Sequence, residues 1–373
     1  MSGRPNAVTT PRTLQDIAAV LTADVVGDGT LLIETIAHPS QADGPGVLAL
    51  AMEPRAEAAL SHTAAIAAVV AAGREEALRP LRGGLIVTRP RYALARLLEL
   101  FAPAPTMANG IHPSAIIDPS ASVGADIAVG AHCVIGPGVH LGDRTMVFPH
   151  VTIGAHVRLG RDCRLYPGVR LGDGCVFGDR VIIHPNAVIG ADGFGWVTPE
   201  KGSIEWAKET GGRIEGTNVA LIRMASMGHV DIGDDVEIGA GTCIDRGTIG
   251  ATRIGRNTKI DNLVQIGHNC TIGENCLIAG TVGLSGSVTV GDRVSLGGGV
   301  GVVEHVSIGD DAVILARSAV ATSVPPREFW GGSPAVPYRD FTQQLFHVRR
   351  VPRLLRDLQD LKARLARLEQ ESR

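Results

Sequence analysis

Histidine is the residue type in this 373-residue sequence best suited to move a proton near neutral pH, and the chain has twelve. An imidazole has a reference pKa of about 6.5, so it can accept a proton as a general base. His268 lies two positions after Ile266 in a six-residue pattern, and this placement differs from that of the other histidines in the pattern. Four histidines lie three positions after an aliphatic residue, where the pattern predicts surface turns: His132, His150, His156 and His305.

Six cysteines are the second set of residues with possible metal or redox chemistry. Five share one position, four residues after an aliphatic residue of the pattern: Cys133, Cys163, Cys175, Cys270 and Cys276. Small residues such as Ala115 and Ala187 take this position elsewhere, and there is no CxxC pair. We therefore expect small buried thiols and no metal site. Reduced thiols in a sequence that starts without an apolar leader favour a cytoplasmic location.

The pattern behind both observations is an apolar residue at every sixth position, here called the hexad residue. It is unbroken over 111–189, resumes over 232–244 and, after a slip of four residues, continues over 254–320. A period of six fits neither an α-helix nor an alternating strand, but it is typical of a parallel β-helix built from hexapeptides. Three hexads would form one triangular coil, so the three runs predict about ten coils.

Composition agrees with a narrow aliphatic prism. Hydrophobic residues make up 45% of the chain but aromatic residues only 3%, so the interior must consist of aliphatic side chains. Glycine often follows the hexad residue directly, as at Gly124, Gly130 and Gly136, and we expect it to supply backbone conformations that a side chain would resist. No apolar run is long enough to span a membrane, and the net charge of -3 gives no electrostatic footprint for nucleic acid.

Three parts of the chain lack the repeat. Residues 1–105 alternate helical and strand patterns over 13–101, which predicts a small α/β domain, for packing or oligomerisation or for substrate recognition. Residues 191–231 interrupt the prism of residues 106–336. This excursion contains Phe194, Trp196 and Trp206, either as a contact surface or packed on the prism.

The C-terminal region, 337–373, is predicted to be helical with a short coiled coil. Its apolar residues are spaced alternately by three and four, as in a heptad repeat: Val351, Leu354, Leu358, Leu361, Leu365 and Leu368. Arginines and a lysine line the same stretch, either as a solvated face or as a docking surface for an acidic protein.

The strings IDRG, IDNLVQIGHN and GADGFG, together with the order of domains, resemble the UDP-3-O-(3-hydroxyacyl)glucosamine N-acyltransferase family of lipid A biosynthesis. The resemblance covers essentially the whole chain. It implies a left-handed parallel β-helix, a homotrimer and active sites in clefts between neighbouring prisms. It also implies transfer of a 3-hydroxyacyl chain from acyl carrier protein to the 2-amino group of UDP-3-O-acylglucosamine. The phosphopantetheine arm arrives with the carrier protein, so no separate cofactor is required. A peripheral position on the inner membrane stays open.

The same resemblance assigns candidate roles. The family's catalytic base aligns with His268 and a second family histidine with His305. Repeat counting adds Gly286, one coil beyond His268, as a backbone donor for the oxyanion or as a plain turn glycine. Counting also predicts one column through Arg246, His268, Gly286 and Glu304/His305, provided that the four-residue slip near 250 is an external bulge. Asp261 and Asn262 are expected either to position substrate or the base or to be polar turn residues.

One departure from the family affects substrate identity. The family binds uracil near a string with Phe, Asn and Tyr, whereas this sequence has Leu50, Glu53 and Ala56 at those places. Three functions therefore stay open: the lipid A N-acyltransferase, a hexapeptide acyltransferase for another nucleotide-linked amino sugar, and a non-catalytic scaffold. A second departure is the long segment after GADGFGW, part of which has no clear family counterpart.

Overall fold

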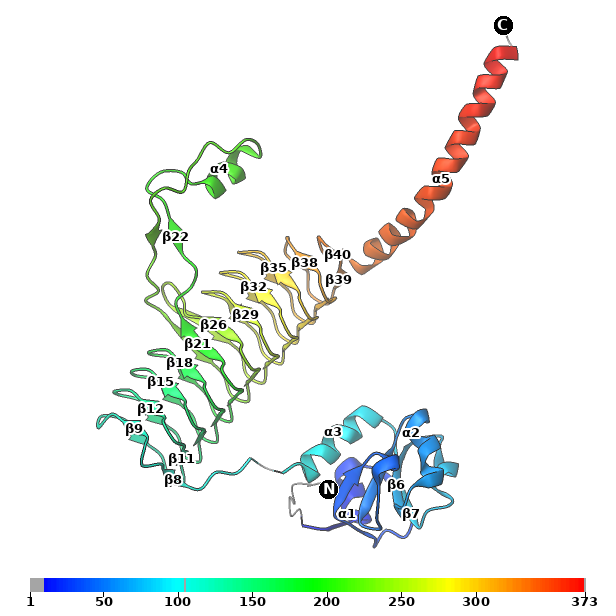
Figure 1. The fold of residues 1–373 in the computed structure, drawn as a ribbon, viewed down its shortest axis with the longest axis vertical. Helices are drawn as coiled ribbons and strands as arrows, with labels where there is room; N and C mark the ends of the chain where they lie inside the picture. Colours follow the sequence, from blue (N-terminus) through cyan, green and yellow to red (C-terminus); the bar gives the residue numbers. More distant parts are fainter. Residues whose placement is uncertain (1–9, 104, 372–373) are drawn as a thin grey trace. The chain divides into compact units, whose positions relative to one another are not determined.

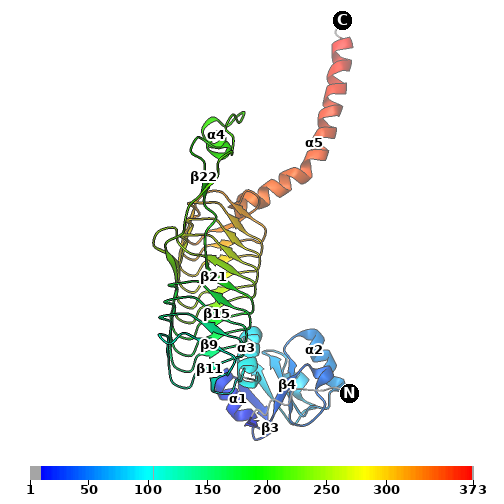
Figure 2. The same cartoon turned by 60° about the vertical axis from the view of Figure 1, so that its left-hand side comes forward.

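The computed structural model describes residues 10–103 and 105–371. The chain forms two compact units, and the boundary between them in the sequence falls between Thr106 and Met107. Figure 1 shows the first unit in blue to cyan and the stacked coils of the second in green to orange, and Figure 2 shows the stack from another direction.

The first unit is a five-stranded sheet with helices on its faces, as the alternating pattern predicts. The strand order is β2-β7-β6-β5-β4, and only β2 is antiparallel to its neighbour. The strands are β2 (Asp24–Gly27), β4 (Thr35–Ala37), β5 (Val47–Ala51), β6 (Ala67–Ala71) and β7 (Gly83–Val87). The helices are α1 (Leu14–Leu21), α2 (Pro54–Ala58) and α3 (Pro90–Phe101), and a small sheet pairs β1 (Arg12–Thr13) with β3 (Leu32–Ile33).

Helix α1 begins where it does because Thr13 caps it. The Thr13 hydroxyl accepts a hydrogen bond from the Asp16 N–H at 3.1 Å, and the Asp16 carboxylate accepts from the Thr13 N–H at 3.3 Å. This reciprocal capping box satisfies two backbone donors that a helix start otherwise leaves unpaired. The buried face of α1, with Leu14 and Ile17, then packs with Leu97 of α3 in one core cluster.

The second unit is a parallel β-helix with three sheets, which confirms the fold predicted from the period of six. Within the described residues the sheets have nine, ten and twelve strands. The nine-stranded sheet contains β10 (Ser122–Val123), β13 (His140–Leu141), β16 (Arg158–Leu159), β19 (Val176–Phe177), β24 (His229–Ile232), β27 (Ala251–Ile254), β30 (Thr271–Ile272), β33 (Thr289–Val290) and β36 (Ser307–Ile308).

The ten-stranded sheet contains β9 (Ile116–Ile117), β12 (Val134–Ile135), β15 (Thr152–Ile153), β18 (Arg170–Leu171), β21 (Val188–Ala191), β26 (Cys243–Asp245), β29 (Gln265–Ile266), β32 (Gly283–Leu284), β35 (Gly301–Val302) and β38 (Ala319–Val320). The twelve-stranded sheet contains β8 (Gly110–Ile111), β11 (Ala128–Val129), β14 (Met146–Val147), β17 (Arg164–Leu165), β20 (Ile182–Ile183), β25 (Glu237–Ile238), β28 (Lys259–Ile260), β31 (Leu277–Ile278), β34 (Ser295–Leu296), β37 (Val313–Ile314), β39 (Phe329–Gly331) and β40 (Val336–Pro337).

The hexad residues fill the interior of the prism. Most of them, from Val129 onward, are nearly inaccessible and form one continuous aliphatic core. The five cysteines expected to be buried are buried in the same core, which confirms that part of the prediction. Ile111 and Val123, in the first coil, are exposed, because only one neighbouring coil covers them.

The reason predicted for the glycines after the hexad residue holds at Gly190, which has a φ of 89°, but is wrong at the three glycines that illustrated it. Gly124, Gly130 and Gly136 are not among the glycines with a positive φ. A side chain there would instead collide with the next coil: an added Cβ would lie 2.5–3.0 Å from its nearest atom at these three positions. Close stacking of coils therefore requires these glycines. The positive φ occurs two residues later, at turn residues such as His132 and His150, which agrees with their predicted turn position.

Two neighbouring coils break the regular register. Other parallel pairs lie 18 residues apart, as in Val134↔Thr152, except the last one, β37–β39, where Val313 and Phe329 are 16 residues apart. The pairs β19–β24, β20–β25 and β21–β26 are separated by 55 residues, as in Val176↔Asp231, because the excursion lies in that coil. The following coil is lengthened by four residues, as in Cys243↔Gln265. The slip in the sequence is therefore a local enlargement that leaves the sheets in register.

The excursion has structure of its own. A two-stranded antiparallel ribbon, β22 (Trp196–Val197) with β23 (Ile222–Arg223), carries helix α4 (Ser203–Thr210) between its strands. Arg223 pairs with Asp192 at the base of the ribbon. Lys208 of α4 pairs with Glu304, two coils beyond His268. Phe194 is 86% exposed, so its ring is not used for packing on this chain's prism.

The C-terminal region forms a single helix over its described part, α5 (Tyr338–Glu371), rather than several helices. The Tyr338 ring stacks on Phe329 of β39 with ring centres 4.4 Å apart. All six heptad residues predicted for a coiled coil are exposed in the single chain. The coiled coil itself stays a prediction, because it requires a second chain.

Candidate active site

The strand register of the ten-stranded sheet places the predicted column on consecutive coils. Ile244, Ile266, Leu284 and Val302 pair one above the other in β26, β29, β32 and β35. The residues two positions after these four therefore share one corner of the prism: Arg246, His268, Gly286 and Glu304. The arrangement depends on the four-residue enlargement being a bulge outside the ladder, as the sequence analysis supposed.

Two glycines flank the His268 ring. A Cβ added at Gly286 would lie 2.7 Å from the ring atoms Nε2 and Cε1. A Cβ added at Gly193 would lie 2.8 Å from Cβ and Cδ2 of His268. Gly193 belongs to the GADGFG string, and its N–H donates to the Ser226 hydroxyl at 3.2 Å. The imidazole therefore fits only because both neighbours lack side chains.

The enlarged coil holds the residue next to the histidine. Oδ1 of Asn269 lies 3.1 Å from Nδ1 of His268 and accepts a hydrogen bond from the Thr248 N–H at 3.0 Å. Nδ2 of Asn269 donates to the Ile249 carbonyl at 2.9 Å. Because Thr248 and Ile249 lie where the coil is enlarged, this bulge forms part of the site.

Two carboxylates act electrostatically on His268. Asp245, at the end of β26, is half-buried, and desolvation raises its pKa against the opposing effects of a Gln265 hydrogen bond and of His268. Glu304 is exposed, and its pKa is lowered chiefly by the hydrogen bond from Lys208. Both carboxylates therefore lie close enough to His268 to feel its charge.

Arg246 lies in the column, but its guanidinium is used within the protein. Its Nε donates to the Gly190 carbonyl at 2.9 Å and its Nη2 to the Asp173 carbonyl at 2.9 Å. These bonds tie the enlarged coil to the preceding ones. The observed contacts favour a structural role over the substrate-positioning role predicted for this residue.

Gly286 and His305 meet through the backbone. The His305 N–H donates to the Gly286 carbonyl at 3.2 Å, while no acceptor for the Gly286 N–H is present among the described residues. His305 has a φ of 62° at an exposed turn, the position predicted for it. A backbone N–H that is left without an acceptor, on a half-exposed residue, is suited to an oxyanion, since a developing negative charge needs a donor already in place.

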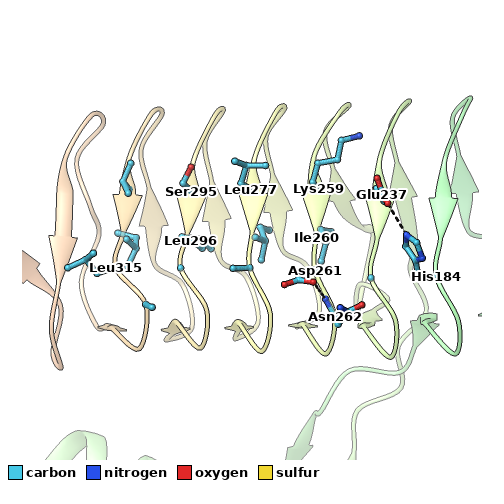
Figure 3. A pocket seen from close by; sticks show the side chains of 17 residues that line it. His184, Glu237, Lys259, Ile260, Asp261, Asn262, Leu277, Ser295, Leu296 and Leu315 are labelled. Carbon is cyan, nitrogen blue, oxygen red and sulfur yellow. Dashed lines mark hydrogen bonds and ion pairs between the residues drawn. The ribbon is translucent and has the colours of Figure 1, made fainter. Parts of the chain in front are cut away.

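Asp261 and Asn262 lie away from His268, on the twelve-stranded sheet. They line a groove of about 740 Å³ that also contains His184, Glu237 and Lys259 (Figure 3). Nε2 of His184 lies 2.8 Å from the Glu237 carboxylate, and Oδ1 of Asn262 accepts a hydrogen bond from the Ala240 N–H at 2.6 Å. A single chain therefore does not bring these residues together with His268.

The first unit has a pocket at the place where the family resemblance predicts uracil recognition. Its volume is about 450 Å³, and Leu50, Glu53 and Ala56 all line it. No phenylalanine, tyrosine or tryptophan is among its lining residues, whereas two arginines, Arg55 and Arg91, are. The departure noted in the sequence therefore falls on a real cavity.

Three residues of the site were missed by sequence reasoning. Gly193 lies in a string already recognised, but nothing in one sequence shows that a glycine 75 positions earlier touches His268. Thr248 and the amide of Asn269 were missed because the slip was treated only as a bulge. The slip itself was the available indication, since an irregular coil beside a candidate base marks a local structure with its own contacts.

Among the described residues, no group of three or more His, Cys, Asp or Glu side chains is placed to hold a metal ion. Nor does any helix in those ranges combine the length and hydropathy that crossing a bilayer requires.

Family models match three segments of the prism. A "GMPPB C-terminal domain" model matches residues 107–201, a "Bacterial transferase hexapeptide (six repeats)" model matches 251–286, and a "Hexapeptide repeat of succinyl-transferase" model matches 287–316. Among solved structures, an Arabidopsis UDP-N-acetylglucosamine acyltransferase aligns with a TM-score of 0.51 at 26% identity, over 61% of this chain and 73% of that one. Both comparisons support the hexapeptide β-helix.

Curated relatives extend the match over nearly the whole chain. The UDP-3-O-acylglucosamine N-acyltransferase of Paracoccus denitrificans is 51% identical over 273 residues, 73% of this chain and 74% of that protein. The enzyme of the same name from Ruegeria pomeroyi is 41% identical over 350 residues, 94% of this chain and 96% of that protein. With this sequence identity over this much of both proteins, this chain belongs to the UDP-3-O-acylglucosamine N-acyltransferase family.

Proposed function

We propose that this protein transfers a 3-hydroxyacyl chain from acyl carrier protein to the 2-amino group of UDP-3-O-acylglucosamine, a step of lipid A biosynthesis, in the cytoplasm. The observation that carries the proposal is the match over 94% of the chain to an enzyme of that name. The His268 site supports the reaction type, because the histidine packs against Gly286, whose backbone N–H has no acceptor in the part of the chain that the structure describes.

His268 is the general base in this proposal. As the substrate amine adds to the thioester carbonyl, a carbon–nitrogen bond forms and the imidazole takes the proton that the nitrogen loses. The carbonyl oxygen becomes an oxyanion, and the Gly286 N–H stabilises it. Collapse of this intermediate breaks the carbon–sulfur bond. The sulfur of the phosphopantetheine arm then takes the proton from the imidazolium, so His268 returns to its neutral state.

We propose a homotrimer in which clefts between neighbouring prisms hold the active sites. In such an assembly the groove with Asp261 and Asn262 would face the His268 column of another copy, although the two are separate within one chain. Helix α5 supports parallel association, because its seam of apolar residues is exposed. Parallel heptads would also pair Asp357 with Lys362 of the next copy.

Acyl carrier protein is the proposed donor. Arg349, Arg350, Arg353 and Arg356 give one stretch of α5 a concentrated positive charge, and residues 341–356 include no acidic residue. A surface of this kind attracts an acidic protein and increases the rate of encounter at low salt. No cofactor besides the carrier's own arm is needed for the reaction as written.

The pocket of the first unit is the proposed nucleotide site. Arg55 and Arg91 supply two charges suited to a diphosphate, and the His38 ring is the only ring in the lining that can stack on a base. Because Leu50, Glu53 and Ala56 replace the family's usual residues, a second candidate function is transfer to another nucleotide-linked amino sugar.

The decisive experiment gives the purified protein a 3-hydroxyacyl carrier-protein thioester and UDP-3-O-acylglucosamine, and measures amide formation by mass spectrometry. We expect N-acylation that His268→Ala reduces by about 10²–10⁴, the usual contribution of a general base. No product with this substrate, but turnover of a different nucleotide-linked amino sugar, would favour the second candidate. Turnover of neither would leave a non-catalytic scaffold.

Light scattering tests the assembly separately. We expect a mass of three chains of 38.9 kDa, and we expect Leu361→Glu to weaken association by placing a charge in the seam. A wild-type monomer at the concentration used for activity measurements would contradict the trimer.

A further inference from the structure

We infer that Asn269 is a positioning residue that holds neutral His268 with its proton on Nδ1 and leaves Nε2 free to accept a proton. The inference rests on the proposed function in one respect only, namely that His268 is the base. The hydrogen-bond argument itself depends on four groups whose donor and acceptor capacities are known: the Asn269 amide, the Thr248 N–H, the Ile249 carbonyl and the His268 ring.

The orientation of the Asn269 amide is determined by the backbone. The Thr248 N–H can only donate, so the amide atom 3.0 Å from it must be the oxygen. The Ile249 carbonyl can only accept, so the amide atom 2.9 Å from it must be the nitrogen. Exchanging the two amide atoms would place two donors together and two acceptors together, which would lose both hydrogen bonds.

The ring tautomer follows from that orientation. Oδ1 of Asn269 also lies 3.1 Å from Nδ1 of His268. A carboxamide oxygen has two lone pairs and no hydrogen, so it can accept from the Thr248 N–H and from the ring at once. Nδ1 must then carry the proton. The Thr248 hydroxyl is 3.5 Å from Nδ1, at the outer limit of hydrogen bonding, and is too distant to replace this bond.

The consequence for catalysis lies on the other side of the ring. A neutral imidazole carries one proton, so Nε2 holds the lone pair. Nε2 is the nitrogen nearer to Gly286, whose N–H is the proposed oxyanion donor. The base atom and the oxyanion donor therefore face the same place in the cleft. The opposite tautomer would present an N–H there, which cannot take a proton from the amine.

The coil enlargement gives Asn269 hydrogen-bond partners that asparagines at the same turn position in other coils do not have. Asn257 and Asn275 occupy the same turn position in coils of the same prism, with φ values of 56° and 57° against 60° for Asn269. Their amides bond to each other, with Nδ2 of Asn257 2.8 Å from Oδ1 of Asn275. Only Asn269 meets the additional residues Thr248 and Ile249. Asn275 therefore supplies a matched control with the same backbone requirement.

The first test measures the tautomer in the free protein. With histidines labelled by ¹⁵N, the His268 signals are identified by their loss in His268→Gln. At a pH where the ring is neutral, we expect a protonated Nδ1 and an unprotonated Nε2, and a shift toward the other tautomer in Asn269→Ala. Asp245 and Glu304, with Lys208 beside Glu304, are the charged groups acting on this ring and are unchanged in both variants.

The second test measures the rate. We expect Asn269→Ala to lower kcat by about 10–10², part of what a general base contributes, with KM changed less than about threefold. Asn269→Asp keeps an oxygen that can accept from both N–H groups but places its other oxygen against the Ile249 carbonyl, so we expect a kcat between those of Asn269→Ala and the wild type. Asn275→Ala removes an amide from the same turn position and should leave kcat unchanged.

The outcomes separate this inference from the proposed function. A protein without N-acylation activity that still shows the Nδ1–H tautomer, dependent on Asn269, would refute the function and leave the hydrogen-bond inference standing. A wild-type ring with its proton on Nε2 would overturn the inference. So would an Asn269→Ala variant with full kcat, or one whose loss is matched by Asn275→Ala.

Discussion

Replacing Gly286 by alanine tests the geometry around His268 with a single methyl group. The added Cβ would lie 2.7 Å from Nε2 and Cε1 of the ring, where ordinary contacts between carbon atoms are about 3.5–4.0 Å. The ring would have to move by roughly 1 Å. Gly193 fits closely against Cβ and Cδ2 of the same side chain, so a shift of this size would break the Asn269 hydrogen bond at 3.1 Å.

The expected cost is therefore in rate rather than in stability. A displacement of about 1 Å in a catalytic group can lower the rate by about 10². The fold should tolerate the change, because Gly286 has no positive φ and the atoms in its way belong to the end of a side chain rather than to the backbone. Initial rates of N-acylation give kcat, and urea unfolding gives the free energy of unfolding.

Gly283→Ala is the matched control. Gly283 lies in β32, three residues before Gly286, and an added Cβ there meets nothing within 4 Å. We expect its kcat to equal that of the wild type. If Gly286→Ala kept full kcat, or if both alanine variants lost activity equally, the close fit around the ring would not be a determinant of the rate.

Three further predictions concern the Arg246 guanidinium, the Lys208–Glu304 ion pair and the buried cysteines. Arg246→Met should lower the free energy of unfolding by about 1–2 kcal/mol, since the carbonyl of buried Gly190 and that of exposed Asp173 both lose a charged donor, while KM for the sugar nucleotide stays unchanged; urea unfolding and steady-state kinetics check both. Glu304→Gln should increase amide exchange in α4 without changing global stability, because the Lys208–Glu304 pair is exposed and contributes little; mass spectrometry of peptides over 203–210 would show it. Burial raises the pKa of Cys163, Cys175 and Cys270 to about 11 from an ordinary value of 9.0. The unfolded chain releases these protons first, so stability should be unaffected below pH 9 and fall between pH 9 and 11 by up to about 1.4 kcal/mol per pH unit for each thiol. Unfolding of the wild type and of the three Cys→Ala variants at pH 8 and pH 10 measures this, and an equal pH dependence in all four would contradict it.

The prism could be predicted from sequence because each hexad repeats the same physical requirement. One residue must be apolar to fill the core, and the next must be small so that the coils can stack. The first requirement was identified correctly. The second was attributed to backbone freedom, because a single sequence shows a glycine but not the neighbouring coil that lies 2.5–3.0 Å from its missing Cβ.

Within the site, only the residues that follow paired strands of successive coils could be predicted from the sequence. Counting in steps of eighteen places Gly286 and Glu304 beyond His268, because the register of paired strands is fixed. Contacts made by irregular segments do not obey that count. Gly193 reaches the ring from the excursion, and Thr248 reaches Asn269 from the enlarged coil. Asp261 follows the count as well, but on another sheet, so its distance from His268 could not be inferred from proximity in sequence.

The four added residues at 247–250 mark one coil of the prism as different from the regular coils around it. In a stack of equivalent coils, each coil contacts only its neighbours, so length can change at either end by whole coils at little cost to the rest. The enlarged coil is the one place where such an exchange would remove the Asn269 contacts. We therefore expect relatives of this chain to vary in the number of coils on either side of this point, and to keep the number of residues between Asp245 and His268 constant.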